Sequence, residues 1–339
     1  MDGKVHNSST RVLDGWYEHF KSLATPSTDG DFDKGYASLV DMEMLEIVDM
    51  CGMQLSGPSQ CVTVHQVQEA IQALNRGKAA DVYGLTAEHF LYGGDDLLMA
   101  TTDIINALFR FGKLTEALKV GVLTPVFKKK GSSIEAKNYR GITILPTITK
   151  ILETVLRQKI RPSIENNQNS LQRGFTQNSS PMNCSLILEE VIREYKDKRQ
   201  PLYIAFLDAK SAFDVVSHNS LMRKLYHIGI DGPEWLLVHS LHEGAESVVK
   251  WEGSVSEKFK VGQGVRQGGI LSTDLYKVYG NILLDRITST GIGCYIGNVC
   301  CAAPTAADDM AILAPSLSTL QKLVSIAVDY SRMERYLLQ

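Results

Sequence analysis

The 339-residue sequence lacks the features that mark membrane, secreted and repetitive proteins. It has no run of about 18 apolar residues, and its first residues show no charged segment followed by an apolar one. It also has no internal repeat and no low-complexity segment. We therefore expect a globular chain inside the cell, in the nucleus or the cytoplasm, with neither a membrane span nor a secretory signal.

Cysteine is scarce and is not arranged for metal binding. The six cysteines stand at positions 51, 61, 184, 294, 300 and 301. They form no Cys-x-x-Cys and no Cys/His spacing suited to zinc. We interpret them as reduced thiols that mostly fill the core, which excludes a disulfide scaffold and a zinc module.

The net charge of -3 hides a strong asymmetry along the chain. Residues 110–161 contain 12 Lys and Arg against 3 Asp and Glu, a net charge of +9, whereas residues 1–109 carry -10 and residues 162–339 carry -2. A concentrated basic block is typical of a surface that contacts phosphate groups. The average charge therefore does not exclude a nucleic-acid partner.

The chain changes its pattern several times. Apolar residues recur at helical intervals before Pro26, and residues 27–36 have the composition of a linker, so we expect residues 1–60 to form a peripheral, partly helical segment. From residue 62, helical patterns alternate with the β-like run GVLTPVFKKK. The final pattern, residues 317–337, predicts another helix.

Three acidic residues stand at the ends of two strand-like runs. An apolar run ends at Asp208 with an amphipathic helix behind it, and hairpin turns are predicted at Glu252-Gly253 and Gly297-Asn298. The stretch PTAADDMAIL places Asp308 and Asp309 before another apolar run. This order predicts an α+β fold: an antiparallel sheet that carries acids at its edge, with helices on one face.

Adjacent like charges at a strand end require compensation. Two carboxylates about 4 Å apart repel by roughly 4 kcal/mol at an effective dielectric near 20. If the strand of Asp208 neighbours the hairpin of Asp308 and Asp309, three carboxylates converge, and such hard oxygen ligands suit a pair of Mg²⁺ ions that promote phosphoryl transfer. The alternative is a solvated turn, which is how we interpret Asp95-Asp96.

Three segments, in order, resemble motifs A, B and C of reverse transcriptases of the non-LTR (LINE-type) retrotransposon family: FLDAKSAFD (206–214), GVRQGGILS (264–272) and AADDMAILAPS (306–316). Upstream, LNRGKAADVYGLTAEHF, LTPVFKKKG, NYRGITILPTITKILE and LQRGF are similar to that family's fingers region. The resemblance covers residues 70–316. It implies a right-hand polymerase with fingers over residues 61–200 and a palm, an antiparallel sheet packed on helices, over residues 201–339.

The resemblance also implies roles for individual residues. Asp208 and Asp308 match the main metal ligands and Asp309 the third acid, for two Mg²⁺ ions that Mn²⁺ can replace. The nucleotide-binding positions are the aromatic sugar gate, the motif-B pair and the fingers cations: Phe213, Gln267, Gly268, Arg140, Lys128 and Lys129. Gln172, Gly174 and Phe175 match a segment beside the template path. The alternatives are a packed phenylalanine, plain glycine-rich turns and solvated lysines.

The function implied is an RNA-directed DNA polymerase that adds dNTPs to the 3′-OH of a DNA primer on an RNA template. Two rivals stay open: a catalytically weak or inactive nucleic-acid-binding remnant, and another two-metal palm enzyme such as a nucleotide cyclase. Motif B and the fingers segments argue against a cyclase, which needs no template. No specific protein partner is indicated.

The sequence departs from the family in two places. Ala306 stands where the family usually has Tyr or Phe, an aromatic that packs near the primer end. The chain ends at Gln339, where the family continues into motif D and the thumb, and no endonuclease domain precedes the fingers. We therefore expect a fragment of a retrotransposon polyprotein that lacks the thumb and binds duplex weakly.

Overall fold

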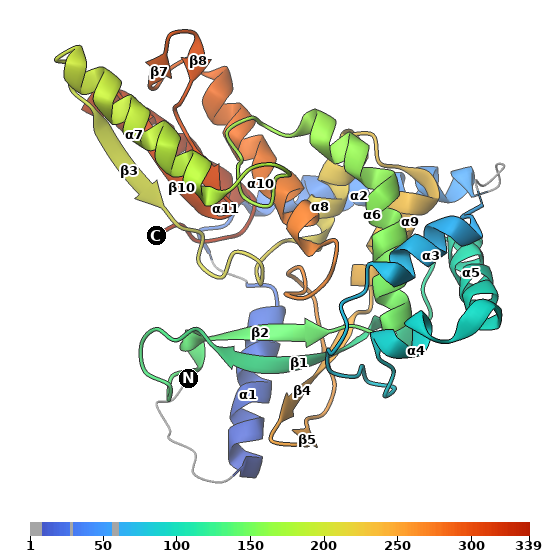
Figure 1. Ribbon diagram of the computed structural model, residues 1–339. Helices are drawn as coiled ribbons and strands as arrows, with labels where there is room; N and C mark the ends of the chain where they lie inside the picture. The colour runs from blue at the N-terminus through green and yellow to red at the C-terminus, as the bar shows by residue number, and fades with distance from the viewer. Residues whose placement is uncertain (1–8, 28–29, 56–60) are drawn as a thin grey trace. The chain divides into compact units, whose positions relative to one another are not determined.

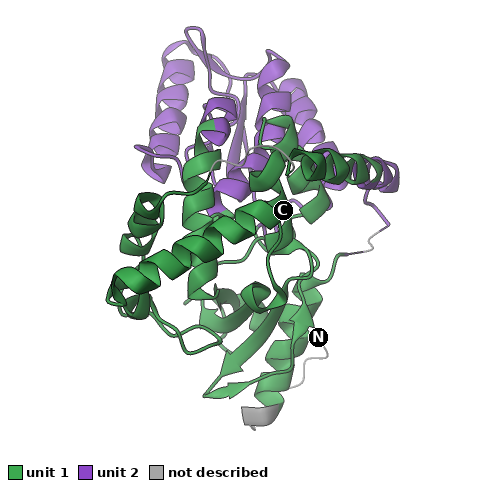
Figure 2. Ribbon diagram, turned by 90° about the vertical axis from the view of Figure 1, so that its right-hand side faces the viewer, with its two compact units in different colours: residues 1–26, 42–162, 213–272 green, residues 27–41, 163–212, 273–339 purple. Residues whose placement is uncertain are grey.

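A computed structural model describes residues 9–27, 30–55 and 61–339. The chain divides into two compact units (Figure 2). The first unit contains residues 1–26, 42–162 and 213–272, and the second contains residues 27–41, 163–212 and 273–339. The predicted boundaries at residues 60 and 200, which separate linker, fingers and palm, rest on sequence motifs and patterns. The two compact units do not test them, so this division stays a prediction.

The sheet of the first unit is mixed (Figure 1). Its strands are β1 (Val120–Phe127), β2 (Tyr139–Ile144), β4 (Glu246–Trp251), β5 (Ser254–Val255) and β6 (Phe259–Lys260). β1 pairs antiparallel with β2 and parallel with β4, whereas β5 and β6 pair antiparallel with β4. The β4–β5 turn at Glu252 and Gly253 has two positive φ angles, as a two-residue hairpin favours, so the predicted turn is confirmed.

Helix α1 (Ser9–Ala24) is not peripheral, contrary to the prediction for residues 1–60. Trp16 and Phe20 lie in a hydrophobic cluster with Leu123 of β1, Val249 of β4 and Phe259 of β6. The aromatic side chains recur every four residues, so they share the helix face that covers the sheet. The same spacing that predicted the helix therefore also encodes its burial.

The other helices of the first unit pack mainly on one another. They are α3 (Val64–Gln72), α4 (Ala87–Leu91), α5 (Gly94–Phe111), α8 (His218–His227) and α9 (Gly232–His242), with short 3-10 turns at Glu116–Lys119 and Ala136–Asn138. α3 packs on α5, α5 on α9 and α8 on α9. Asp95 and Asp96 are exposed, but they occupy the first turn of α5 rather than a loop. Acidic side chains there are stabilised by the positive end of the helix dipole, which explains the pair without a metal.

Asp81, in the loop before α4, forms hydrogen bonds to the first residue of helix α6 (Thr147–Asn167). One carboxylate oxygen accepts hydrogen bonds from the backbone N–H of Thr147 at 2.7 Å and from its hydroxyl at 3.0 Å. The other oxygen accepts from the backbone N–H groups of Tyr83 at 2.9 Å and Leu85 at 3.0 Å. Asp81 is buried, so this one side chain satisfies donors from two segments that are 66 residues apart.

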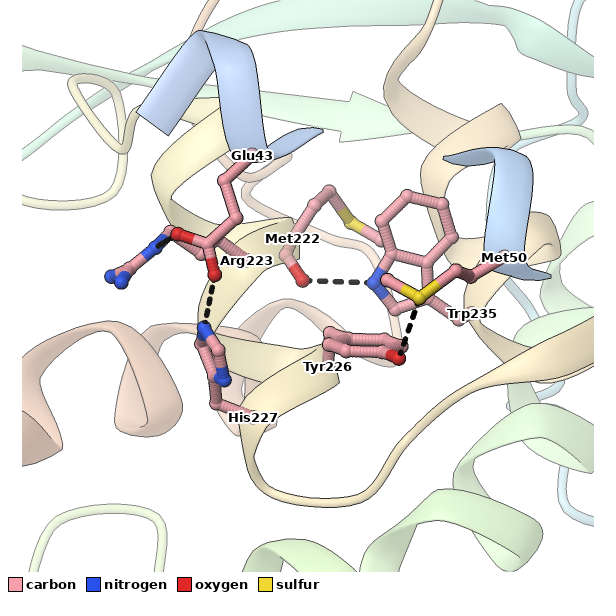
Figure 3. A network of polar contacts seen from close by, with 7 residues as sticks. All are labelled: Glu43, Met50, Met222, Arg223, Tyr226, His227 and Trp235. Atoms are coloured by element: carbon pink, nitrogen blue, oxygen red, sulfur yellow. Dashed lines mark hydrogen bonds and ion pairs between the residues drawn. The ribbon is translucent and has the colours of Figure 1, made fainter. Parts of the chain in front are cut away.

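Helix α2 (Lys34–Gln54) contains residues of both units. It begins at Lys34, so the predicted linker, residues 27–36, extends too far at its C-terminal end. Residues 28–29 lie outside the described residues. Within the first unit, Glu43 of α2 accepts hydrogen bonds from Arg223 and from His227, the latter at 2.6 Å (Figure 3). Burial alone would raise the pKa of Glu43, but these two hydrogen bonds hold it below its usual value. Beside them, the Trp235 ring N–H donates to the Met222 carbonyl at 2.8 Å.

The second unit is built on an antiparallel sheet of order β3-β10-β9. Its elements are α7 (Pro181–Asp197), β3 (Tyr203–Leu207), α10 (Ser272–Ser289), β7 (Tyr295–Ile296), β8 (Val299–Cys300), β9 (Thr305–Ala306), β10 (Asp309–Ala314) and α11 (Leu317–Met333). α11 packs on β3 and β10. On α7, Val191 and Tyr195 pack with Ala311 and Leu313 of β10, and Figure 1 shows α7 running along β3.

The α+β fold class is therefore confirmed, with an antiparallel sheet packed on helices. The β7–β8 hairpin turns at Gly297 as predicted, whereas the final helix ends at Met333 rather than at residue 337. None of the helices in the described part of the chain is long and apolar enough to cross a membrane.

Replacing Asp81 should destabilise the first unit. Asp81→Ala removes the carboxylate that accepts from the backbone N–H groups of Thr147, Tyr83 and Leu85, and we expect a loss of about 2–3 kcal/mol in the free energy of unfolding. The measurement is urea unfolding followed by circular dichroism. The exposed Asp103 of α5 is the matched control, since Asp103→Ala should change stability by less than about 0.5 kcal/mol. Equal effects of the two substitutions would contradict the anchoring role.

Candidate active site

The register of one strand pair brings the predicted acids to the same end of a sheet. In the antiparallel β3–β10 pair, Leu207 is the partner of Met310. Asp208 follows Leu207 and Asp309 precedes Met310, so both acids lie at this end of the strand pair. Asp208 and Asp308 are partly buried, whereas Asp309 is exposed. The sequence-based condition that the two strands be neighbours is met.

Asp308 lies in the tight turn between β9 and β10. Ala306 pairs with Asp309, which leaves Ala307 and Asp308 as the two turn residues. Ala307 has a φ of 66°, a left-handed conformation that costs a non-glycine residue about 1 kcal/mol. Such a strained turn persists only where its surroundings hold it.

Gln172 supplies that restraint. Its side-chain Nε2 donates to the Ala307 carbonyl at 3.1 Å, and its Oε1 accepts from the Ala307 N–H at 3.0 Å and the Gly174 N–H at 2.8 Å. Gln172 is buried, and the flanking backbone pairs with Thr305 through Leu171 and Arg173. One amide side chain therefore clamps both polar groups of the strained residue beside Asp308.

Gly174 is required for this close approach. A Cβ built on Gly174 would lie 2.1 Å from the backbone nitrogen of Ala307 and 2.8 Å from the carbonyl carbon of Ala306. No side chain fits there without moving the turn. Phe175, the third residue of this segment singled out in the sequence, is half exposed, and its predicted place beside the template path stays a prediction.

The backbone of Asp208 is held from a second side by the last three residues. Asp208 and Gln339 exchange two backbone hydrogen bonds of 3.0 Å, and Lys210 N–H donates to the Leu337 carbonyl at 2.9 Å. The Gln339 side-chain amide also donates to Asp208 Oδ2 at 3.1 Å. Asp208 therefore keeps a fixed backbone position, while one of its two carboxylate oxygens already accepts a hydrogen bond.

Tyr276 of α10 is a site residue that the sequence reasoning missed. Its side chain is buried, and it lines a small cavity together with Gln172, Leu207 and Asp308. Burial raises the pKa of Tyr276 well above its usual value, and the charges of Asp308, Asp208 and Asp309 raise it further. The hydroxyl therefore stays neutral within the field of all three carboxylates.

The chemistry of the acids suits a hard divalent cation, although their side chains are not gathered on one point. All donors are carboxylate oxygens, the ligand type that Mg²⁺ and Mn²⁺ accept. Among residues 9–27, 30–55 and 61–339, no group of three or more His, Cys, Asp or Glu is arranged to hold a metal ion. Binding such an ion requires the acidic side chains to turn toward a common position.

In the first unit, the ends of the predicted motifs A and B are paired with each other. The Val265 N–H donates to the Phe213 carbonyl and the Gly264 N–H to the Val216 carbonyl, both at 2.8 Å. Phe213 is half-buried, so it is neither fully packed nor free in solvent. The predicted gate residue and the predicted motif-B residues therefore belong to one hydrogen-bonded loop structure.

The motif-B loop also docks on the end of β2. The Thr143 N–H donates to the Gln267 carbonyl at 2.7 Å. Gly268 has a φ of 124°, and a Cβ at this position would lie 2.4 Å from the Thr143 carbonyl oxygen. Glycine is therefore necessary at the second position of the pair.

Glu153 of α6 holds the other side of this loop and was not recognised in the sequence. Its carboxylate accepts from the Ile270 N–H at 2.8 Å. Burial raises the pKa of Glu153 to about 7, against the opposing effects of the Ile270 hydrogen bond and of Arg266 and Lys150. Sequence offered no signal for a contact between residues 117 positions apart.

The predicted triphosphate cations lie on the β1–β2 hairpin. Arg140 pairs with Val126, and the Lys128 N–H donates to the Asn138 carbonyl at 2.8 Å, which continues the ladder past the strand end. Alternation along the strand puts Arg140 and Lys128 on the same face, whereas Lys129 has a φ of 56° and begins the loop. All three cationic side chains are exposed, as phosphate contacts require.

Comparisons with known proteins agree with these motifs. Residues 127–337 match the family model "Reverse transcriptase (RNA-dependent DNA polymerase)". The chain is 28% identical over 212 residues to a Pol polyprotein of the type-1 retrotransposable element R2 of Popillia japonica, which covers 62% of this chain and 30% of that protein. It is 27% identical over 266 residues to the RNA-directed DNA polymerase from mobile element jockey of Drosophila funebris, covering 78% and 28%.

The chain thus spans less than a third of the length of these relatives. Among solved structures, a telomerase from Candida tropicalis truncated from its C-terminal domain is similar over 67% of this chain and 49% of that one, with a TM-score of 0.48 and 17% identity.

The clamp on the β9–β10 turn gives a prediction with an internal control. Gly174→Ala should destabilise the second unit by about 1–3 kcal/mol, because the added methyl group meets the backbone of Ala307. Gly280→Ala, in the middle of α10 with open space around it, should instead stabilise by about 0.5–1 kcal/mol. Thermal unfolding of the two variants tests the difference in sign. A stable Gly174→Ala variant would show that the turn tolerates displacement.

Proposed function

Because the chain belongs to the reverse transcriptase family, as a domain of the non-LTR retrotransposon type, we propose that it transfers deoxynucleotides to a primer 3′-OH on an RNA template. The observation that supports this proposal is the β3–β10 register, which leaves Asp208 and Asp309 at the same end of the strand pair, with Asp308 in the clamped turn next to Asp309. These are the positions at which the family resemblance places the metal ligands.

Asp208 and Asp308, with Asp309 as third acid, would hold the divalent ions. Two bound Mg²⁺ ions, or Mn²⁺ in their place, supply activation of the attacking hydroxyl and stabilisation of the leaving oxygen. The protein contributes the fixed backbone positions of these acids. The neutral Tyr276 hydroxyl adds no negative charge to a site that already carries three carboxylates.

The family resemblance assigns nucleotide binding to six further residues. Arg140 and Lys128 share one face of the β1–β2 hairpin and offer charge-assisted hydrogen bonds to a triphosphate, with Lys129 adding charge at the loop. Gly268 lets the backbone approach a base pair closely, and Gln267 offers a side-chain amide beside it. The half-buried Phe213 ring would crowd a ribose 2′-OH and so favour deoxynucleotides.

A second candidate function is a domain that binds nucleic acid without catalysis. It is favoured by one observation: within the described part of the chain, the acidic side chains do not gather into a group of three ligands. The two candidates differ in whether the acids are needed for nucleotide addition.

Asp308→Asn should abolish primer extension on poly(rA)/oligo(dT) with Mg²⁺ or Mn²⁺, a loss of about a hundredfold or more in rate, because a neutral amide cannot replace a charged metal ligand. In metal-free buffer its free energy of unfolding should be unchanged or slightly higher, since a like charge is removed. The exposed Asp329 of α11 is the control, and Asp329→Asn should extend primers normally. Undiminished extension by Asp308→Asn would contradict the metal assignment, and a wild-type chain that binds template but never extends the primer would favour the second candidate.

Phe213→Ala should relax sugar discrimination. Removing the ring leaves room for a 2′-OH, so the ratio of dNTP to rNTP incorporation should fall by about tenfold or more, the effect of losing 1.4 kcal/mol of discrimination. Phe111→Ala, at an exposed position of α5, should leave the ratio unchanged. Loss of soluble protein, or a wild-type ratio, would show that Phe213 acts only in packing.

A further inference from the structure

We propose that Asp214 is a positioning residue that fixes which way the side-chain amide of Gln267 faces. The inference rests on the proposed function, in which Gln267 faces the incoming nucleotide. Asp214 stands directly after the predicted gate residue, and neither the motif resemblance nor the metal assignment gives it a role.

The contact is direct, and both partners are held by their backbones. Gln267 Nε2 donates to Asp214 Oδ1 at 3.1 Å. The Gln267 carbonyl is tied to Thr143 at 2.7 Å, and the chain on both sides of Asp214 is tied to the motif-B loop through the Phe213 and Val216 carbonyls. With both backbones held, the remaining degree of freedom is the orientation of the Gln267 side-chain amide, and the Asp214 carboxylate determines that orientation.

The chemistry of the two groups makes the choice unambiguous. An ionised carboxylate only accepts hydrogen bonds, whereas a primary amide has a donor end and an acceptor end. Gln267 must therefore turn its NH₂ group toward Asp214, which leaves Oε1 directed elsewhere. A ligand that meets Gln267 is thus presented with a carbonyl acceptor and with the second amide N–H.

The surroundings strengthen this dependence. Asp214 and Gln267 line one cavity of the first unit with Gln263, Thr143 and apolar side chains such as Phe259. Burial raises the pKa of Asp214 to about 6, while the hydrogen bond from Gln267 and the charge of Lys128 act to lower it. Arg266 is the other charged residue that lines the cavity, and its guanidinium donates to the Lys119 carbonyl at 2.6 Å.

A pH dependence follows from these facts. Above about pH 6 the carboxylate is ionised and holds the amide in one orientation. As the pH falls through about 6, Asp214 takes up a proton and can itself donate to Oε1, so the amide loses its fixed orientation. The same loss of preference is expected at neutral pH when Asp214 is replaced by Asn, which can donate as well as accept.

The test uses the whole chain labelled with ¹⁵N-glutamine. The side-chain amide resonance of Gln267 is assigned by its absence in Gln267→Ala. In the wild type it should titrate with a midpoint near pH 6, and in Asp214→Asn it should be shifted at pH 7.5 and no longer titrate. Asp231→Asn is the matched control, because Asp231 accepts a hydrogen bond from Gln54 in the same unit and should leave the Gln267 resonance unchanged.

Kinetics separate this inference from the proposed function. Asp214→Asn should raise the KM for dNTP by up to about tenfold with little change in kcat, the range expected for one lost hydrogen bond. It should have no further effect in a Gln267→Ala background. A Gln267 resonance that neither titrates in the wild type nor responds to Asp214→Asn overturns the positioning role. A resonance that responds, together with a Gln267→Ala variant of normal KM, overturns the nucleotide contact of Gln267 instead and with it the specificity role of Asp214.

Discussion

The fixed register between β3 and β10 is the constraint on which the candidate site depends. Antiparallel pairing of Leu207 with Met310 leaves Asp208 and Asp309 at the same sheet end, although they are about a hundred residues apart in the chain. A slip of one residue would turn every side chain of β10 to the opposite face, and because both faces are buried from Met310 to Ala314, it would disrupt the packing on each of them. The hydrophobic core of the second unit therefore determines where the acids lie.

Two partly buried amide contacts then hold the loops that carry the candidate site residues. In the second unit, Gln172 binds both polar groups of Ala307, so the strained turn beside Asp308 keeps one conformation. In the first unit, Asp214 binds the amide of Gln267 in the motif-B loop. Both contacts combine with a glycine that admits no Cβ, Gly174 in one case and Gly268 in the other.

Much of this was predictable from local patterns, and the remainder was not, for physical reasons. Apolar runs predicted β3 and β10, and the order of the patterns predicted an antiparallel sheet with acids at its edge. That the strand of Asp208 neighbours the hairpin of Asp308 was a condition, which the pairing of β3 with β10 meets. The partners of Gln172 and Glu153 lie more than a hundred residues away, so no local pattern identifies them. The apolar face of α1 was visible in the sequence, but its partners in the sheet were not.

The most direct test of this account is whether Asp208 and Asp308 bind the same ions. Free Mn²⁺ measured by electron paramagnetic resonance gives the affinity of the wild type, Asp208→Asn, Asp308→Asn and the double variant. Changing a residue that only hydrogen-bonds to a metal ligand lowers metal affinity by roughly tenfold or more, so each single variant should lose at least about tenfold in Mn²⁺ affinity. The double variant should lose little more affinity than either single variant. Independent, additive losses would show that the two acids do not share a metal site, and unchanged affinity in all variants would contradict the assignment of the catalytic centre.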